Sequence, residues 1–304
     1  DSPSGSFVEL MEPVAHAIGL TYNASLKPMM DISAEHSGGE SWERVNDLET
    51  EPPEGGVHSK VFVSHGARRG IIAFRGMCFL KDLEECQADG CFGLHINGSG
   101  TRSSVQYKET NQSCEPFQDR MDYVAQAQAV VASLHERHPD YRLLLVGHSL
   151  GGFLSIVTAA FHPGVLQAIG FAPTPFNWAM RNLYGFTQQD QDELPHEDLI
   201  AIGDQYDLGY NAALAEGPDS VTTCLFHDIE EPLPCNLMGI TVFDEGDPDW
   251  RNRVRNSVWG GTCKLAAHKW ERYETIVFAR EPNGTSPAHL PTCSLSPYDA
   301  MSAS

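Results

Sequence analysis

The residues best suited to covalent chemistry lie in one short segment, where an apolar stretch runs into a glycine-rich turn around a serine. Residues 143 to 152 read Leu-Leu-Leu-Val-Gly-His-Ser-Leu-Gly-Gly. A serine on a sharp turn between a strand and a helix presents its hydroxyl as a nucleophile, and flanking glycines let neighbouring backbone pack closely. We therefore expect Ser149 to be a nucleophile, with Gly147 and Gly151 making room for it. The alternative is a glycine-rich strand–helix turn in some other doubly wound protein.

Two elements must flank this serine if it is to act in that way. Residues 141 to 146 are an apolar run typical of a buried strand, and residues 151 to 161 form an apolar, alanine-rich segment typical of a helix. Pro163 and Gly164 then stop that helix. The sequence thus predicts a strand, a turn and a helix around Ser149.

A serine nucleophile also needs donors that stabilise the oxyanion formed on its substrate. One donor is the N–H group after the nucleophile, here Leu150, and the other comes from a loop after an earlier strand. Residues 70 to 76 read as a short apolar strand ending in Phe-Arg-Gly, so Met77 is the candidate for the second N–H group. An ordinary core strand followed by a glycine is the simpler alternative.

These two segments together resemble the class 3 lipases, the filamentous-fungal type of α/β-hydrolase. The resemblance extends from about residue 57 to residue 273 and is specific only near the two motifs. It implies an α/β-hydrolase fold, with a mostly parallel, doubly wound sheet flanked by helices, and hydrolysis of a carboxylic ester. Met77 departs from the family pattern, which usually has Ser or Thr there, with a hydroxyl that adds to the oxyanion hole.

The serine requires a histidine base and a carboxylate, which follow in the order Ser, Asp, His in this fold. Asp204 and Asp207 both come after an apolar run at 199–203 that predicts a strand. The resemblance favours Asp207, because the family's acid lies a few residues beyond the strand, and it leaves Asp204 as a turn former.

Thirteen histidines compete for the role of base. The resemblance favours His268, which lies late in the chain and has an aromatic residue shortly after it, with His289 and His227 as alternatives. His148, next to the nucleophile, is expected to point away from the reacting centre and to pack.

The wider pattern predicts one α/β-hydrolase domain over residues 1–304, because the candidate catalytic residues are spread along the chain. Its parts are an N-terminal extension over about 1–56 with a helix at 7–20, a hairpin of strands at 57–64 and 70–74, and a cysteine-rich surface excursion over about 77–117. A helix at 119–138 and strands at 165–172 and 199–203 complete the βα alternation. Four aromatic residues between those strands would line an acyl pocket or bury a covering loop: Phe176, Trp178, Tyr184 and Phe186.

Cysteines and glycosylation sequons together indicate a secreted protein. The chain has eight cysteines, without the paired spacing of a zinc site, which favours disulfides. Proximity in sequence suggests the pairs Cys224–Cys235 and Cys263–Cys293, and it leaves the four others to pair among themselves: Cys78, Cys86, Cys91 and Cys114. Sequons begin at Asn23, Asn97, Asn111 and Asn283. The start at Asp1 suggests a mature form whose signal peptide has been removed.

Charge narrows the choice of partners. With 20 Lys and Arg against 41 Asp and Glu, the net charge is −21, which disfavours nucleic acid and strong attraction to anionic lipid. We expect a neutral lipid or another carboxylic ester as substrate, transient contact with lipid surfaces at most, and no cofactor or metal. Phospholipids, galactolipids and feruloyl esters remain alternative substrates, a catalytically inactive binding protein is a further alternative, and the oligomeric state is left open.

Overall fold

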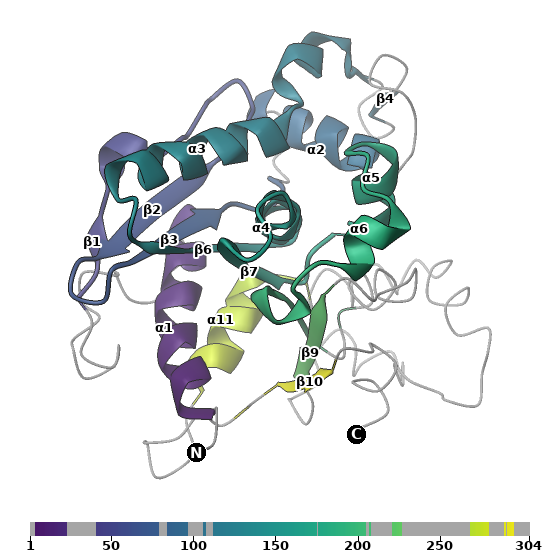
Figure 1. The fold of residues 1–304 in the computed structure, drawn as a ribbon. Helices are drawn as coiled ribbons and strands as arrows, with labels where there is room; N and C mark the ends of the chain where they lie inside the picture. Colours follow the sequence, from purple (N-terminus) through teal and green to yellow (C-terminus); the bar gives the residue numbers. More distant parts are fainter. Residues whose placement is uncertain are drawn as a thin grey trace, which may run out of the picture.

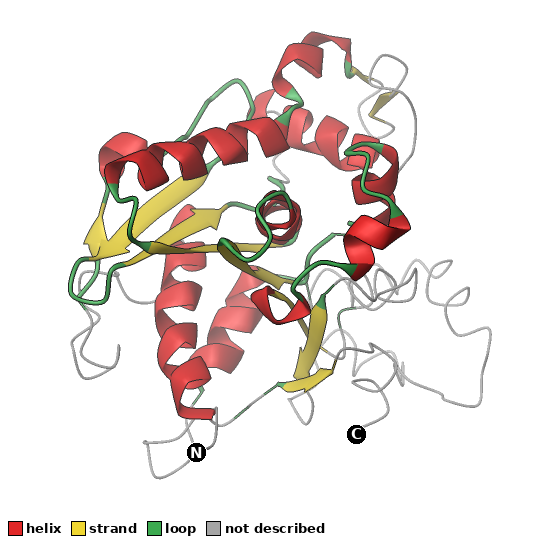
Figure 2. Cartoon of the chain, viewed as in Figure 1, coloured by secondary structure: helices red, strands yellow, loops and turns green. Residues whose placement is uncertain are grey.

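A central sheet with helices on both faces organises the chain (Figures 1 and 2). The computed structural model describes residues 4–22, 41–78, 84–96, 106–107, 112–174, 176–204, 207, 221–226, 268–279, 289 and 291–294. Its main strands are β1 (Glu43–Arg44), β2 (Ser59–Ser64), β3 (Arg69–Phe74), β6 (Arg142–His148), β7 (Leu166–Phe171), β8 (Leu199–Asp204), β9 (Thr222–Phe226) and β10 (Thr292–Ser294). A separate small pair is β4 (Gln106–Tyr107) with β5 (Gln112–Ser113).

The strand order of the large sheet is β1-β2-β3-β6-β7-β8-β9-β10. The five strands from β3 to β9 run parallel to their neighbours, whereas β1, β2 and β10 are added in antiparallel fashion. The predicted hairpin is present as β2 and β3. The parallel strands are almost entirely buried and apolar, as strands covered by helices on both faces must be. This mostly parallel, doubly wound sheet is the architecture of the α/β-hydrolase fold.

The helices divide between the two faces of the sheet. They are α1 (Ser4–Thr21), α2 (Glu84–Ile96), α3 (Tyr123–Arg137), α4 (Leu150–Ala160), α5 (Asn177–Asn182), α6 (Gln188–Asp192) and α11 (Trp270–Phe278), with short 3₁₀ turns at Asn46–Leu48, Glu115–Arg120 and His196–Asp198. In Figure 1, α3 and α4 cover one face and α1 and α11 the other, which agrees with the contacts between these elements. The predicted helices at 7–20, 119–138 and 151–161 therefore form, with ends shifted by a few residues.

Residues 77–117 differ from the predicted surface excursion. The described part contains α2, in which nine residues are buried, among them Phe92 and Ile96. Phe92 stacks on Tyr123 of α3, with ring centroids 4.4 Å apart. The prediction failed because α2 includes Gly90, Gly93, Asp89 and two half-cystines, so its sequence lacks the apolar periodicity that marks a packed helix.

The disulfide pairing predicted for the C-terminal half is wrong. Cys224 is bonded to Cys293, because β9 and β10 are antiparallel neighbours whose register places these two residues opposite each other. The other predicted partners, Cys235 and Cys263, lie outside the described residues. The four remaining cysteines do pair among themselves, as Cys78–Cys86 and Cys91–Cys114. All four sequon asparagines also lie outside the described residues.

Two of the four aromatic residues after β7 line a pocket distant from the serine. Tyr184 and Phe186 pack against Phe161, with ring centroids 6.0 and 4.9 Å away, and line a pocket of about 390 Å³ at the C-terminal end of α4. Ser149 precedes the other end of this 11-residue helix, about 16 Å away at 1.5 Å per residue. These two aromatic residues therefore fit the covering loop better than an acyl pocket at Ser149. In the part of the chain that the structure describes, no helix is long and apolar enough to cross a bilayer.

Candidate active site

Ser149 lies on a strained turn between β6 and α4. Its backbone angles, φ 56° and ψ −119°, fall in a region that residues other than glycine rarely adopt. Three hydrogen bonds hold this geometry. The Ser149 N–H group donates to the carbonyl of Phe171 at 2.8 Å, and the Ser149 carbonyl accepts from the N–H groups of Phe153 at 3.0 Å and Thr174 at 3.3 Å. Strain maintained by the surrounding structure is typical of functional residues.

The glycines around Ser149 are required by close backbone contacts. A Cβ atom on Gly151 would lie 2.1 Å from the carbonyl oxygen of Phe74, and one on Gly147 would lie 2.3 Å from the Gly151 carbonyl. Both distances are shorter than van der Waals contact, so only glycine fits at either position. The turn therefore packs directly on the C-terminal end of β3, where the second predicted motif lies.

His268 connects Ser149 to a buried carboxylate. Its Nε2 atom is 2.8 Å from Ser149 Oγ, and its Nδ1 atom is 2.8 Å from Asp207 Oδ2. The Asp207 side chain is fully buried, whereas that of His268 is 23% exposed. Because the Asp207 carboxylate accepts a hydrogen bond from the Nδ1–H group, Nε2 carries no proton and can accept one from the serine hydroxyl. The three residues selected from the sequence are thus in contact, in the order that proton transfer from a serine requires.

Asp204 makes different contacts. Its carboxylate pairs with the guanidinium of Arg272, and its backbone carbonyl accepts the N–H group of Asp207 at 2.9 Å. It therefore closes the turn after β8, as expected for a turn former. Of the alternative bases, His289 is half-buried and His227 lies outside the described residues.

Tyr273 of α11 links the two aspartates, and the sequence did not single it out. Its hydroxyl accepts the Asp204 N–H group at 3.1 Å and donates to Asp207 Oδ2 at 2.9 Å. Burial, followed by the charges of Asp207 and Asp204, raises the pKa of Tyr273 well above its usual value. It therefore stays protonated and donates to the same carboxylate oxygen as His268. The sequence did not indicate these contacts, because Tyr273 fits the pattern of buried residues along α11.

The Asp207 carboxylate also sets the protonation of His268. Burial lowers the pKa of this imidazole, but the charge of Asp207 and the hydrogen bond to it raise the pKa more, so the net result lies above the ordinary histidine value. A more basic imidazole is a better proton acceptor. The arrangement can therefore deprotonate Ser149 as it attacks and stabilise the resulting imidazolium.

His148 does not point away from the reacting centre, as the sequence had suggested. Its ring lies beside that of His268, with centroids 4.9 Å apart, and it is almost fully buried. Tyr22, which follows α1, places its hydroxyl 3.0 Å from His148 Nδ1. Burial and the neighbouring His268 lower the pKa of His148 to about 3, so the ring is neutral and packs behind the base.

Both predicted oxyanion donors lie near Ser149. Leu150 is the first residue of α4, where N–H groups have no partner within the helix. On the other side, a Cβ atom on Gly76 would lie 3.2 Å from Ser149 Cβ and 2.6 Å from the His148 carbonyl oxygen, which places the loop containing Met77 against the nucleophile. The Met77 side chain extends to α2, where its methyl group lies over Gly93.

Among the described residues, one group could bring three ligand atoms within 4.8 Å of one another, namely Cys78, Glu85 and Cys86. The two sulfur atoms are joined in a disulfide, so they are not available as thiolate ligands.

Comparison with known proteins agrees with this geometry. Residues 98–163 match the model of the lipase (class 3) family, and this stretch contains β6, Ser149 and α4. No curated protein sequence matches the chain significantly.

The chain is also similar to solved fungal lipases. For Lip2 lipase from Yarrowia lipolytica the identity is 17%, with 77% of this chain and 81% of that chain covered and a TM-score of 0.42. For the lipase from Rhizopus microsporus var. chinensis the identity is 13%, the coverage 73% and 75%, and the TM-score 0.41. For lipase II from Rhizopus niveus these values are 13%, 72% and 80%, and 0.42. The strand order and the turn at Ser149 are those of the α/β-hydrolase fold. The chain therefore has an α/β-hydrolase fold and is similar to the class 3 lipase family over residues 98–163.

Proposed function

We propose that this hydrolase is a serine esterase of the lipase type, which cleaves carboxylic esters through an acyl-enzyme on Ser149. The observation that carries the proposal is the pair of 2.8 Å contacts that join Ser149 Oγ to His268 and His268 to Asp207. A serine hydroxyl is a weak nucleophile unless a base removes its proton, and the base needs a carboxylate to fix its tautomer. All three groups are present at hydrogen-bonding distance.

In this mechanism the Ser149 oxygen attacks the ester carbonyl while its proton passes to His268 Nε2. The negative charge that develops on the carbonyl oxygen is stabilised by the N–H groups of Leu150 and Met77. His268 then returns the proton to the leaving alcohol, and an acyl group remains on Ser149. Water, activated by the same histidine, hydrolyses this intermediate. Each of these steps uses only groups of the protein, the substrate and water.

The net charge and the disulfides support the proposed substrate class and location. A net charge of −21 favours a neutral lipid or another neutral ester. Three disulfides in the described residues fit an oxidising, extracellular environment, in line with the proposal that the protein is secreted.

The test is reaction with a fluorophosphonate probe together with a panel of esters. The probe is expected to label wild type and the control variant Ser133→Ala, which alters an exposed serine of α3, but not Ser149→Ala. The panel compares short and long p-nitrophenyl esters, triglyceride, phosphatidylcholine, galactolipid and methyl ferulate. Labelling that persists in Ser149→Ala would refute the assignment, and absence of turnover on every ester would favour an inactive binding protein.

A further inference from the structure

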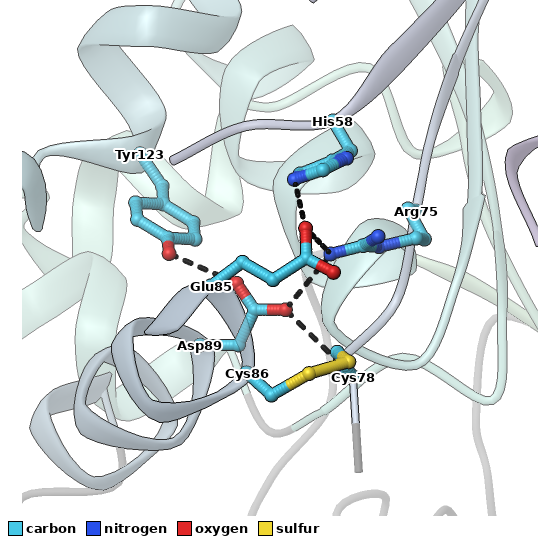
Figure 3. Close-up of a disulfide and its surroundings, with 7 residues drawn as sticks. All are labelled: His58, Arg75, Cys78, Glu85, Cys86, Asp89 and Tyr123. Carbon is cyan, nitrogen blue, oxygen red and sulfur yellow. Dashed lines mark hydrogen bonds and ion pairs between the residues drawn. A yellow bond between two sulfur atoms is a disulfide. The ribbon is translucent and has the colours of Figure 1, made fainter. Parts of the chain in front are cut away.

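A buried polar cluster lies directly behind the loop that carries Met77 (Figure 3). It joins residues from the loop after β3, from α2, from α3 and from the segment before β2: Arg75, Cys78, Glu85, Cys86, Asp89, Tyr123 and His58. The proposed mechanism uses none of these side chains. Burying so many ionisable groups is costly unless each is paired, so their contacts show what the cluster holds in place.

Asp89 of α2 is the centre of this cluster. Its side chain is only 4% exposed. One carboxylate oxygen, Oδ2, accepts the backbone N–H group of Cys78 at 3.0 Å and faces Arg75 Nη2 at 3.5 Å. The other oxygen, Oδ1, accepts the hydroxyl of Tyr123 at 2.9 Å. A single carboxylate thus joins α3 to the backbone of the loop.

The two loop contacts of Asp89 fall on either side of the proposed oxyanion donor. The sequence here is Arg75-Gly76-Met77-Cys78, so one contact precedes Met77 by two residues and the other follows it by one. The contact at Cys78 is to the backbone, and the Arg75 backbone N–H group is held separately by the His58 carbonyl. The backbone is thus held on both sides of Met77, which restricts rotation of the peptide planes between these two points.

Other members of the cluster strengthen the same link. The Cys78–Cys86 disulfide joins the loop covalently to α2. The Glu85 carboxylate accepts a hydrogen bond from Arg75 Nη2 at 3.4 Å and lies 2.9 Å from His58 Nε2. The backbone carbonyl of His58 accepts the Arg75 N–H group at 3.0 Å. The guanidinium of Arg75 is thus held between two acids of one helix, with Asp89 nearest to the loop backbone.

We propose that Asp89 is a positioning residue for the oxyanion hole, and that its carboxylate orients the Met77 N–H group toward the reacting carbonyl. This inference rests on the proposed function. An oxyanion donor works only when it lies within about 2.7–3.1 Å of the developing charge, and a shift of about 1 Å can cost about 100-fold in rate. Met77 offers no hydroxyl to share this task, so the backbone donor must be well oriented.

The electrostatics of Asp89 agree with such a role. Burial raises its pKa to about 6, although Arg75, the Cys78 N–H group and Tyr123 oppose the shift and Glu85 adds to it. The charged form is therefore retained at neutral pH against a desolvation cost. Carboxylates whose pKa is strongly shifted by burial and by a charged partner cluster at functional sites.

The experiment compares Asp89→Leu with Asp89→Asn in the full-length protein. Leucine removes both acceptor oxygens at similar volume, whereas asparagine keeps one oxygen that can still accept the Cys78 N–H group. We expect kcat to fall about 100-fold in Asp89→Leu and less than about tenfold in Asp89→Asn, with KM changed little in either. The affinity for a boronic acid, which forms a tetrahedral anionic adduct on the serine, is expected to fall in parallel with kcat.

One control separates positioning from general destabilisation. Asp47→Asn breaks an exposed pair with Arg137 that lies outside the cluster. This variant is expected to keep kcat and boronic acid affinity within about threefold of wild type, whatever its thermal stability. A folded Asp89→Leu with unchanged kcat would overturn the proposal.

Amide hydrogen exchange at Met77 and Cys78 gives a readout that does not depend on turnover. Exchange at both amides is expected to accelerate in Asp89→Asn and more in Asp89→Leu, while amides of β6 stay protected. If wild type hydrolyses no ester, the proposed function fails, and this measurement still reports whether Asp89 holds the loop. If the leucine variant does not fold, Asp89→Ala, which also lacks both acceptor oxygens, takes its place, and unchanged exchange at both amides together with wild-type kcat would exclude the positioning role.

Discussion

Asparagine substitutions at the two aspartates after β8 should have opposite effects, since the acids are close in sequence but serve different partners. Asp207→Asn is expected to abolish most activity and to leave the protein folded. Asp204→Asn is expected to leave the reacting groups in place and to lower stability. The reason is that Asp207 Oδ2 contacts His268 at 2.8 Å, whereas the Asp204 carboxylate pairs with Arg272.

The size of each effect can be worked from these contacts. An amide at position 207 can donate to His268 Nδ1, which moves the imidazole proton to Nε2, where it faces Ser149 Oγ and blocks proton transfer. Loss of a triad carboxylate in this way costs about 10⁴ in kcat, or about 5 kcal/mol in activation free energy. Asp204→Asn removes the buried carboxylate charge that pairs with Arg272, and breaking such a pair costs about 3–5 kcal/mol of unfolding free energy.

The assay measures kcat on a short soluble ester and unfolding by denaturant for both variants and wild type. We expect the order of kcat to be wild type, then Asp204→Asn within about tenfold, then Asp207→Asn far below. The order of stability should place Asp204→Asn last. If Asp204→Asn remains folded and loses more kcat than Asp207→Asn, then Asp204, and not Asp207, is the carboxylate that supports the base.

Three shorter predictions concern the same groups. The kcat/KM is expected to rise with pH, with a midpoint above the ordinary histidine pKa, because the pKa of His268 is raised and only the neutral imidazole accepts a proton. A pH profile of kcat/KM whose midpoint lies below the ordinary histidine pKa would contradict this prediction. Met77→Ser is expected to raise kcat by adding a hydroxyl donor near the oxyanion, and an unchanged rate would mean that the hydroxyl does not reach it. Gly151→Ala is expected to lower the unfolding free energy by at least about 1–3 kcal/mol, since its methyl group would lie 2.1 Å from the Phe74 carbonyl, and an equally stable variant in a melting experiment would refute the close approach.

Local patterns predicted the sheet and the turn well, because each depends on neighbouring residues. The apolar run before Ser149, the glycines around it and the hairpin of β2 with β3 are all visible within short windows, and the structure contains each of them. The helix α2 was missed because disulfides and a buried ion cluster hold it, and neither produces an apolar period. The pair Cys224–Cys293 was missed because it spans 69 residues and follows from strand register, which proximity in sequence cannot reveal.

The groups missed at the site share a physical cause. Tyr273 contacts Asp207 across 66 residues, and Asp89 contacts the loop from a helix that the sequence did not predict. In each case the residue type is ordinary for its element, since a tyrosine on α11 is one more core aromatic. Only the folded chain shows where the hydroxyl or carboxylate is directed. Sequence therefore identified the groups proposed to react, and structure was needed to find those that orient them.

Tyr22 shows how far such orientation extends through the chain. The residue lies just after α1, in a segment expected to be an extension, yet its hydroxyl reaches His148 Nδ1 over 126 positions of sequence. That contact holds the His148 ring against His268 from behind, and burial keeps His148 neutral. A neutral neighbour matters because His268 becomes a cation when it accepts the serine proton, and a second charge 4.9 Å away would oppose that step. The N-terminal helix therefore contributes to the site by keeping an uncharged ring in place behind the proposed base.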